Sequence, residues 1–418
     1  MPSPSPMPWI YAARARVGHW QRTPLTFALL AVLGYCLAAL PILAHHHFDP
    51  SAFIVAGDRY VDATQVPSPI IVQQNSNGYD GQFFYRLALS PFQLQQTAFG
   101  IQIDHPAYRE QRIFYPVLVW IAAAGHQAAV PVAMFLVNLA GLAAIAVFAT
   151  TLTARLRLPA ITPLAIMLWP GFLIALTHDT SEIVATALLL LALDAYFAKR
   201  LLAYCVLGAL ATLTRQTTLP ILAGVACFEA VQAIQTPRPA TSWHRTLVCG
   251  LAMAPFLVWL AALHLTWGPA SSAGTNLLGW PFRGAAIMLR DTLIGAKHFV
   301  QANRPGMDAL VRVYVVESAA WLLAFCAVTA TRIPFVLRLP NTGALAAGWL
   351  PIFALMSMMT ADGGWVDRTG YFRAFTECYV VGCLIIAARP VPRWLTWLML
   401  AGSGLAFLGA WVLTIGEK

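Results

Sequence analysis

Apolar stretches of about 20 residues recur along this chain, and they constrain its fold more than any other feature. They begin at residue 24 and continue to the C-terminus. A helix of about 20 apolar residues crosses the roughly 30 Å hydrocarbon core of a bilayer. Of the 418 residues 59% are hydrophobic and only 10% are charged, whereas soluble domains carry about 25% charged residues. The sequence therefore predicts an all-α, polytopic membrane protein, with a single integral membrane domain over residues 1–418.

The hydropathy pattern predicts about eleven membrane-spanning helices. Their approximate bounds are 24–44, 129–152, 159–177, 180–198, 201–214, 217–235, 246–267, 309–330, 341–360, 372–388 and 394–415. The apolar stretch 113–125 is interpreted as a re-entrant or interfacial segment, because its 13 residues are few for a span. Two long loops remain, 45–128 and 268–308. Both contain amphipathic pieces, such as 82–92 and 280–300, which we expect to lie as helices in the membrane interface.

The distribution of charge predicts the orientation. Alternate connections between the predicted spans carry thirteen basic residues and no acidic one: Arg14, Arg16, Arg22, Arg155, Arg157, Lys199, Arg200, Arg238, Arg245, Arg332, Arg338, Arg389 and Arg393. By the positive-inside rule this side is cytoplasmic. The N-terminal tail 1–23 is then cytoplasmic, both long loops are extracytoplasmic, and the expected location is a cell inner membrane. A cleaved signal peptide is the rival interpretation of residues 1–44, but the long apolar part without an Ala-x-Ala site favours an uncleaved anchor.

Several kinds of site are not indicated. All seven cysteines lie in apolar segments, which predicts neither a disulfide framework nor a zinc site. Three adjacent histidines, His45, His46 and His47, cannot all face one ion from a regular backbone. The sequence predicts no bound metal or cofactor, although a role for a divalent metal stays open. Nucleotide-binding loops and nucleic-acid motifs are absent, and the net charge of +9 is explained by topology.

The first long loop concentrates polar chemistry beside the predicted membrane surface. Asp80 lies in the stretch Tyr79-Asp80-Gly81-Gln82-Phe83-Phe84-Tyr85-Arg86, where Gly81 permits close approach of other backbone. Three arginines follow in the same loop: Arg86, Arg109 and Arg112. A carboxylate is thus accompanied by cations suited to phosphate. An ordinary solvated loop residue is the alternative interpretation of Asp80.

This loop resembles that of a known family. The stretches Tyr79-Asp80-Gly81-Gln82-Phe83-Phe84-Tyr85-Arg86-Leu87-Ala88 and Tyr108-Arg109-Glu110-Gln111-Arg112-Ile113-Phe114-Tyr115-Pro116 look like the first outer loop of polytopic GT-C glycosyltransferases. The likeness is closest to the branch that includes GPI-type mannosyltransferases and their bacterial relatives, which pair a Trp-Asp-x-x-x-Phe/Tyr-x-x-Ile-Ala motif with a downstream Phe-x-Pro-x-x-Pro segment. Here Tyr79 replaces the usual Trp and the second proline is missing. The resemblance covers roughly residues 20–220.

The resemblance implies a glycosyltransferase of hexosyltransferase type. Such an enzyme would transfer a sugar from a polyprenyl-phosphate donor to a hydroxyl of a glycan, lipid or protein acceptor, with its active site outside the cytoplasm. Asp80 aligns with the motif aspartate, the expected catalytic base, and a single displacement would be inverting. Asp58 is the rival base, since many GT-C enzymes place the catalytic acid soon after the first span. Asp104 is a candidate acceptor contact or a plain loop residue.

Further charged residues are candidates for substrate binding. Glu182 opens a predicted span at a turn where the resembled family also has a Glu, and a role as a helix cap is the alternative. Arg215 lies between two apolar runs at the depth of a lipid phosphate, where snorkelling is the alternative. Arg368 and Arg373 lie at the outer end of the predicted span 372–388 and could meet the same phosphate.

Three other functions compete with this interpretation. A lipid or polysaccharide transporter would explain the spans but not the concentration of polar chemistry on one side, and no internal repeat is evident. An O-antigen polymerase or ligase would be expected to carry more arginines in its outer loops. A structural membrane scaffold would have no use for Asp80. The sequence favours the glycosyltransferase, with lipid-linked sugar and membrane lipid as partners and no nucleic acid.

Overall fold

The structure, a computed structural model, describes residues 24–235, 239–268, 277–295, 308–339, 342–361, 363–365, 369–389 and 392–417. It is mostly helical, with 73% helix and 3% strand. Six helices in the described part are long and apolar enough to cross a membrane: Pro24–His45, Gln127–Arg155, Gln216–Gln235, Trp243–Trp267, Asp308–Val336 and Trp394–Gly416. The chain is therefore a polytopic, largely α-helical membrane protein, while the count of about eleven spans stays a prediction.

The other predicted spans are also helical, but they are shorter. Four of them are single helices of 12 to 16 residues: α9 (Glu182–Phe197), α10 (Leu201–Thr214), α17 (Gly343–Ser357) and α19 (Thr376–Ala387). The prediction of one continuous helix over 159–177 is wrong, because the segment is divided into α7 (Thr162–Met167) and α8 (Pro170–Thr177). Trp169 between them is extended, as expected before a proline, whose ring disfavours helical backbone in the preceding residue.

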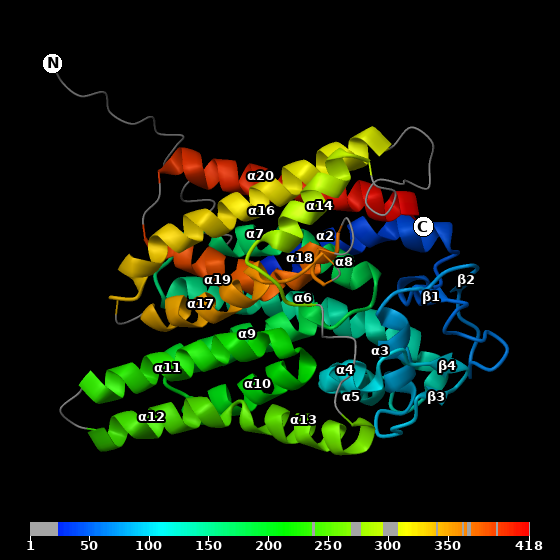
Figure 1. The fold of residues 1–418 in the computed structure, drawn as a ribbon, viewed down its shortest axis with the longest axis horizontal. Helices are drawn as coiled ribbons and strands as arrows, with labels where there is room; N and C mark the ends of the chain where they lie inside the picture. The colour runs from blue at the N-terminus through cyan, green and yellow to red at the C-terminus, as the bar shows by residue number, and fades with distance from the viewer. Residues whose placement is uncertain are drawn as a thin grey trace.

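The long helices lie side by side, and the elements of the first long loop gather at one end of them (Figure 1). The helices in this array are α2 (Pro24–His45), α6 (Val130–Arg155), α11 (Leu219–Gln235), α16 (Asp308–Val336), α20 (Arg393–Glu417) and the consecutive pair α12 (Pro239–Leu251) and α13 (Ala254–Trp267), which together contain the apolar segment Trp243–Trp267. Among the shorter helices, α9 packs against both α6 and α10, and α17 packs against α11. The described C-terminus lies at the same end as the first long loop (Figure 1).

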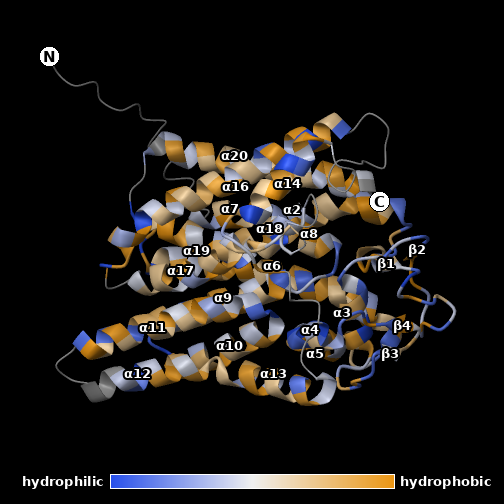
Figure 2. Ribbon diagram, viewed as in Figure 1, coloured by the Kyte–Doolittle hydropathy of each residue, from blue (hydrophilic) through white to orange (hydrophobic). Residues whose placement is uncertain are grey.

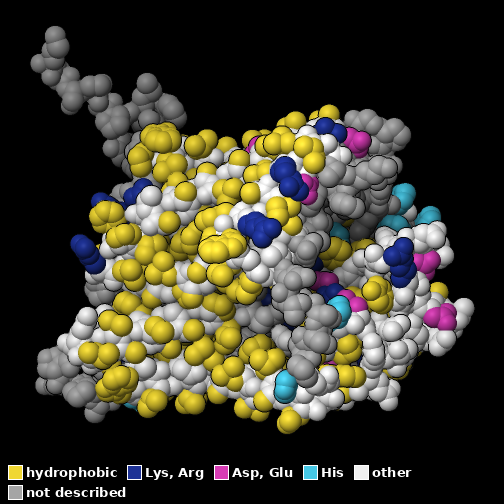
Figure 3. All heavy atoms as spheres, in the orientation of Figure 1, with side chains coloured by type: hydrophobic (Ala, Val, Ile, Leu, Met, Phe, Trp, Pro, Cys, Tyr) yellow, Lys and Arg dark blue, Asp and Glu magenta, His cyan; other side chains and the backbone are white. Residues whose placement is uncertain are grey.

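The surface of this array is apolar. Hydrophobic residues predominate along the helices in Figure 2, and hydrophobic side chains cover the broad middle of the visible face in Figure 3. Large apolar side chains are widely exposed, such as Leu25 at 73% and Leu265 at 86%. Monomeric soluble proteins rarely expose large apolar patches, so this face fits a lipid environment.

The first long loop folds into short strands and helices. Strands β1 (Ala56–Gly57) and β2 (Val72–Gln73) pair in parallel, and β3 (Thr97–Ala98) and β4 (Ile101–Gln102) pair antiparallel. They accompany three helices, α3 (Gly81–Leu89), α4 (Pro106–Arg109) and α5 (Phe114–Ala122), and 3₁₀ turns that include η1 (Pro50–Phe53) and η2 (Glu110–Arg112). With nine residues, α5 is too short to cross a bilayer and packs against α3 and α6.

The expectation that residues 82–92 lie as an interfacial helix is wrong for α3. All nine residues of this helix are buried inside the protein. Phe84 and Tyr85 pack into a cluster with α5 and α6, while Phe83 and Leu87 pack on another side with Ile103. Helix α3 has apolar residues on more than one side, and in the folded protein each of these sides packs against another segment. In the second long loop α14 (Arg283–Leu293) packs against α16, and residues 296–300 of the predicted amphipathic piece lie outside the described residues.

The buried helix α8 connects two segments that carry charged residues, the turn between α8 and α9 and the short helix α18 (Gly370–Ala374). Trp169, directly before α8, is fully buried, stacks on Tyr379 at a centroid distance of 4.1 Å and donates to Thr376 Oγ1 at 3.0 Å. A Cβ at Gly171 would lie 2.7 Å from the carbonyl oxygen of Phe372, so only glycine permits this approach. The start of α8 is thereby held against α18 and the start of α19, and the α8–α9 turn follows at the other end of α8.

Candidate active site

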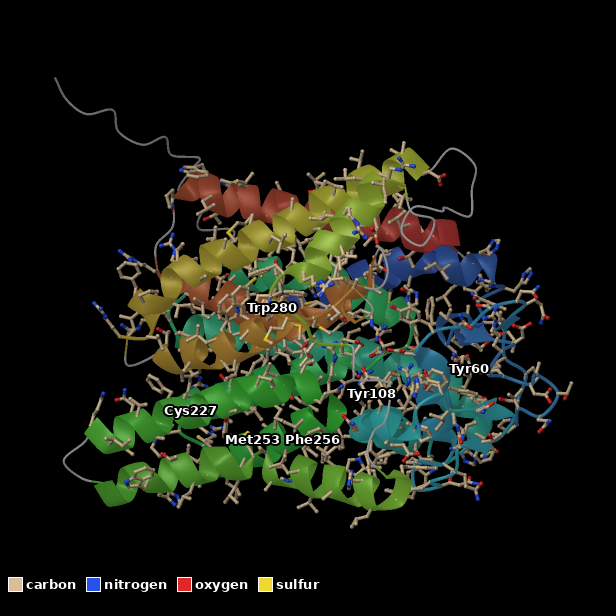
Figure 4. The ribbon with its side chains drawn as sticks, viewed as in Figure 1. Tyr60, Tyr108, Cys227, Met253, Phe256 and Trp280 are labelled. Atoms are coloured by element: carbon tan, nitrogen blue, oxygen red, sulfur yellow. The ribbon has the colours of Figure 1, made fainter. Side chains whose placement is uncertain are left out.

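One cavity of about 540 Å³ opens where the first long loop meets the ends of the helices. Its polar lining residues come from distant parts of the sequence: Tyr79, Asp80, His105, Tyr108, Arg109, Arg112, Glu182, Arg215, Gln216, Thr217 and Arg373. Apolar side chains line another part of the wall: Leu277, Leu278, Leu355, Met356 and Met359. Tyr108, which belongs to α4, is labelled in Figure 4. The cavity therefore offers a charged wall and an apolar wall to the same bound molecule.

Asp80 is the carboxylate at the centre of the charged wall. It immediately precedes α3, and its side chain is 24% exposed. A Cβ at Gly81 would lie 2.6 Å from the Ile54 carbonyl oxygen and closer still to that of His178. Glycine at this position therefore allows the start of α3 to approach the α8–α9 turn. This approach brings Asp80 next to the residues that follow α8.

Three arginines surround the Asp80 carboxylate. Its Oδ1 is 2.6 Å from Arg109 Nη1, and its Oδ2 is 2.9 Å from Arg373 Nη2 and 3.7 Å from Arg112 Nη1. Burial raises the pKa of the Asp80 carboxyl, but the charges of Arg109, Arg373 and Arg112 outweigh burial and hold the pKa well below its ordinary value. Asp80 is therefore ionised and strongly paired.

Two of the three arginines around Asp80, Arg109 and Arg112, are held by other partners as well. Arg109 Nε and Nη2 donate to both oxygens of Asp104, at 2.8 and 2.7 Å, and its guanidinium lies 4.4 Å from the centre of the Phe83 ring. Arg112 donates to Tyr108 Oη at 2.6 Å and to the Gln216 side chain at 3.1 Å. Because bidentate and stacked contacts restrict a guanidinium, both groups are oriented independently of Asp80.

A second, deeper layer of charge links the helix ends. Glu182 Oε1 accepts from Arg373 Nε at 2.9 Å and Nη2 at 2.7 Å, and it lies 3.5 Å from Arg215 Nη2. Arg215 Nη1 is 2.6 Å from Glu377 Oε2, and its Nη2 donates to the Arg373 carbonyl oxygen at 3.0 Å. All four side chains are less than 10% exposed. The network ties α9, α10, α18 and α19 together below the cavity.

Glu377 is a member of this network that the sequence analysis does not predict, although the sequence carries a signal for it. It lies within the predicted span 372–388, surrounded by apolar residues. Ionisable residues inside spans are costly and usually have a function or a charged partner. The structure supplies that partner in Arg215, 162 residues earlier in the chain.

The arginine-bearing turn η2 is attached to α13 through Glu110. The backbone carbonyl oxygen of Glu110 accepts a hydrogen bond from Trp259 Nε1 at 2.8 Å, and the Glu110 side-chain Oε2 accepts one from Trp267 Nε1 at 2.7 Å. The Glu110 side chain is fully buried. Burial raises the pKa of this carboxyl to about 7, against the opposing effects of the Trp267 hydrogen bond and the Arg86 charge.

Two other residues predicted for the site lie elsewhere. Asp58 lines a separate cavity in the first long loop together with Tyr60 (Figure 4). Its oxygens accept from the backbone N–H groups of Asn75 and Ser76 at 2.8 and 3.0 Å, and these bonds lower its pKa. Both carboxylate oxygens thus organise a turn, and the structure does not bring Asp58 to the charged wall.

Arg86 is also outside the charged wall. It is fully buried on α3 and donates to the carbonyl oxygens of Gln93 and Gln95, each at 3.1 Å. These bonds hold the segment that follows α3. Arg368 lies outside the described residues. Of the predicted site residues, the structure brings five to Asp80 or its network: Arg109, Arg112, Glu182, Arg215 and Arg373.

Within the described ranges no group of three or more His, Cys, Asp or Glu side chains could hold a metal ion. Asp80 and Glu182, which line the cavity, and Asp104 and Glu377 behind it are paired with arginines: Arg109, Arg112, Arg215 and Arg373. Comparison of the chain with protein-family models, with curated proteins and with solved structures found no match. The likeness to GT-C glycosyltransferases thus stays a prediction, and the geometry of the cavity carries the functional argument.

Proposed function

We propose that this protein is an integral-membrane glycosyltransferase of GT-C type that transfers a sugar from a polyprenyl-phosphate donor to an extracytoplasmic hydroxyl. The observation that carries the proposal is the cavity in which Asp80, four arginines and an apolar wall lie together at the end of apolar helices. A lipid-phosphate sugar needs these features at once. The apolar wall suits its first isoprene units, the guanidinium groups suit its phosphate, and the carboxylate suits the acceptor's proton.

In the proposed reaction Asp80 is the general base. It takes the proton of the acceptor hydroxyl while the acceptor oxygen attacks the anomeric carbon of the sugar. The bond between that carbon and the phosphate oxygen breaks, and its electron pair leaves with the phosphate. Arginines held in fixed positions stabilise the charge that develops on the leaving group. Attack from the face opposite the phosphate inverts the anomeric configuration.

The direction of the helices supports an extracytoplasmic site. Glu182 begins α9 at the cavity, whereas Lys199 and Arg200 follow the other end of this helix. Likewise α6 begins after the first long loop and ends at Arg155. The basic connections and the cavity therefore lie at opposite ends of these helices, and most acidic side chains visible in Figure 3 lie toward the end that carries the strands. Under the positive-inside rule the cavity end is extracytoplasmic.

A transporter of lipid-linked glycans is the second candidate, because one observation favours it. The helix break at Trp169 resembles the discontinuous helices that form transport sites near the membrane midplane. In those proteins the broken helices surround a charged site. Here Trp169 is surrounded by the aromatic rings of Trp321, Phe372 and Tyr379, and the charged groups lie beyond the other end of α8. The glycosyltransferase therefore fits the position of the charges better.

The test compares two matched substitutions, Asp80→Asn and Asp58→Asn. Both keep the size of the side chain, but asparagine cannot take up the acceptor's proton. With a purified polyprenyl-phosphate sugar as donor, Asp80→Asn should lower the transfer rate by about 10²–10⁴-fold, and Asp58→Asn should change it much less. Full activity of Asp80→Asn would remove the proposed base. Absence of any transfer by the wild-type protein, with loss of lipid-linked glycan export in a deletion strain, would favour the transporter.

A further inference from the structure

Asp80 is poorly suited to accept a proton in the arrangement that the structure shows. Each of its two oxygens already contacts a guanidinium group, Arg109 through Oδ1 and Arg373 through Oδ2. A general base works best when its pKa lies near the operating pH, and the arginines hold the pKa of Asp80 well below its ordinary value despite its burial. Asp80 first has to lose these partners if it is to act as the base.

The arginines themselves do not depend on Asp80 for their positions. Arg109 keeps both oxygens of Asp104, and Arg373 keeps two donors on Glu182. Arg112 keeps its tyrosine and glutamine partners. If Asp80 moved away, three guanidinium groups would still converge on the place that its carboxylate occupies. The carboxylate therefore fills the anion position of a site that the rest of the protein builds.

Asp80 can leave its position more easily than Glu182 and Glu377, the acids of the deeper layer of charge. Its side chain is 24% exposed to the cavity, whereas the side chains of Glu182 and Glu377 are at most 1% exposed. It makes no capping hydrogen bond to the first turn of α3. Besides the adjacent Tyr79, the titratable groups around it are His105, Tyr108, Arg109, Arg112, Glu182 and Arg373.

We propose that the phosphate of the lipid donor displaces Asp80 from Arg109, Arg112 and Arg373, and that the displaced carboxylate becomes the base. This inference rests on the proposed glycosyltransferase function. Donor binding would then precede base activation, so that the acceptor hydroxyl is deprotonated only when a donor is in place. The acceptor proton passes to a displaced Oδ of Asp80, and the electron pair of the broken sugar–oxygen bond leaves on the phosphate. Asp80 returns the proton to water when the product leaves.

Displacement predicts an unusual effect of Asp80→Asn on binding. Asparagine removes the charge that competes for the arginines, so this variant should bind a polyprenyl monophosphate more tightly than the wild-type protein while it transfers sugar more slowly. The dissociation constant should fall by at least about tenfold, which corresponds to 1.4 kcal/mol. Binding is measured by isothermal titration in detergent micelles. Asp80→Ser removes the same charge and replaces the asparagine variant if that variant does not fold.

Asp104→Asn is the matched control, because it changes the other carboxylate that contacts Arg109. Asp104 orients Arg109 through the Nε and Nη2 atoms, which do not contact Asp80. The Asp104→Asn variant should therefore bind the lipid phosphate more weakly. An unchanged or weaker affinity in Asp80→Asn would overturn the displacement, even if transfer by the wild-type protein supports the glycosyltransferase. Absence of both binding and transfer in the wild-type protein and in Asp80→Asn would instead remove the proposed function, and with it this inference.

Discussion

The ion pair of Arg215 and Glu377 offers the sharpest test of what holds the helix ends together. Arg215 Nη1 and Glu377 Oε2 are 2.6 Å apart, and their side chains are 6% and 0% exposed. In Glu377→Met the arginine would lose its closest anion. It would keep the Arg373 carbonyl oxygen at 3.0 Å and Glu182 at 3.5 Å. The buried charge would then be only partly compensated.

The size of the effect follows from the geometry. Removing one partner of a buried ion pair costs about 3–5 kcal/mol of folding free energy, because the other charge stays buried without compensation. Arg215 retains two acceptors, so we expect Glu377→Met to cost about 3 kcal/mol, at the lower end of that range. Arg215→Met should cost a similar amount, since it leaves Glu377 unpaired. The double variant replaces both charges by apolar groups and should lie within about 1 kcal/mol of the wild-type protein.

The assay is unfolding in mixed detergent micelles, followed by the fluorescence of the 14 tryptophans. The exposed pair of Arg290 and Asp291 supplies the control, because Arg290 is 66% exposed. Asp291→Asn should change the free energy of unfolding by less than about 1 kcal/mol. Transfer activity should stay low in the double variant although its stability recovers, because it lacks Arg215, one of the four arginines that line the proposed active site.

Strict additivity would refute this reasoning. If the cost of the double variant equals the sum of the two single costs, the two residues do not act as a coupled pair. The helix ends would then be held together by the packing of the surrounding helices, and the charges would contribute nothing specific to their attachment.

Two further predictions concern the first long loop and the orientation. Because the pKa of Glu110 in the folded protein is about 7, above its ordinary 4.5, the free energy of unfolding should fall as pH rises from about 4.5 to about 7. In Glu110→Gln, which can still accept from Trp267, this contribution should be absent, and an unchanged pH profile would contradict it. For orientation, Asp62→Cys should react with a membrane-impermeant maleimide in intact cells, and Lys199→Cys only after permeabilisation, both in a background without the exposed Cys227. Reaction of Lys199→Cys in intact cells would reverse the topology.

Much of the helical framework could be predicted from the sequence, because a segment that crosses the hydrocarbon core must be apolar along its whole length. A run of about 20 apolar residues forms a helix wherever it lies in the chain, and the helices at Pro24–His45 and Asp308–Val336 follow this rule. The break before Pro170 was missed although its signal is local. The burial of α3 was missed for a different reason. Its partners include α5 and residue Ile103, and nothing within the helix specifies that they cover it.

The sequence by itself determined the membrane character of the chain and placed Asp80 in one loop with Arg109 and Arg112. Only the tertiary structure decided which charges meet. Arg373 contacts Asp80 across 293 residues of chain, and Glu377 contacts Arg215 across 162. Hydropathy and the positive-inside rule act on short segments, so they can be read along the chain. Ion pairs between helix ends depend on which helices pack together and on how far each is shifted along its axis. The packing of the whole core determines both.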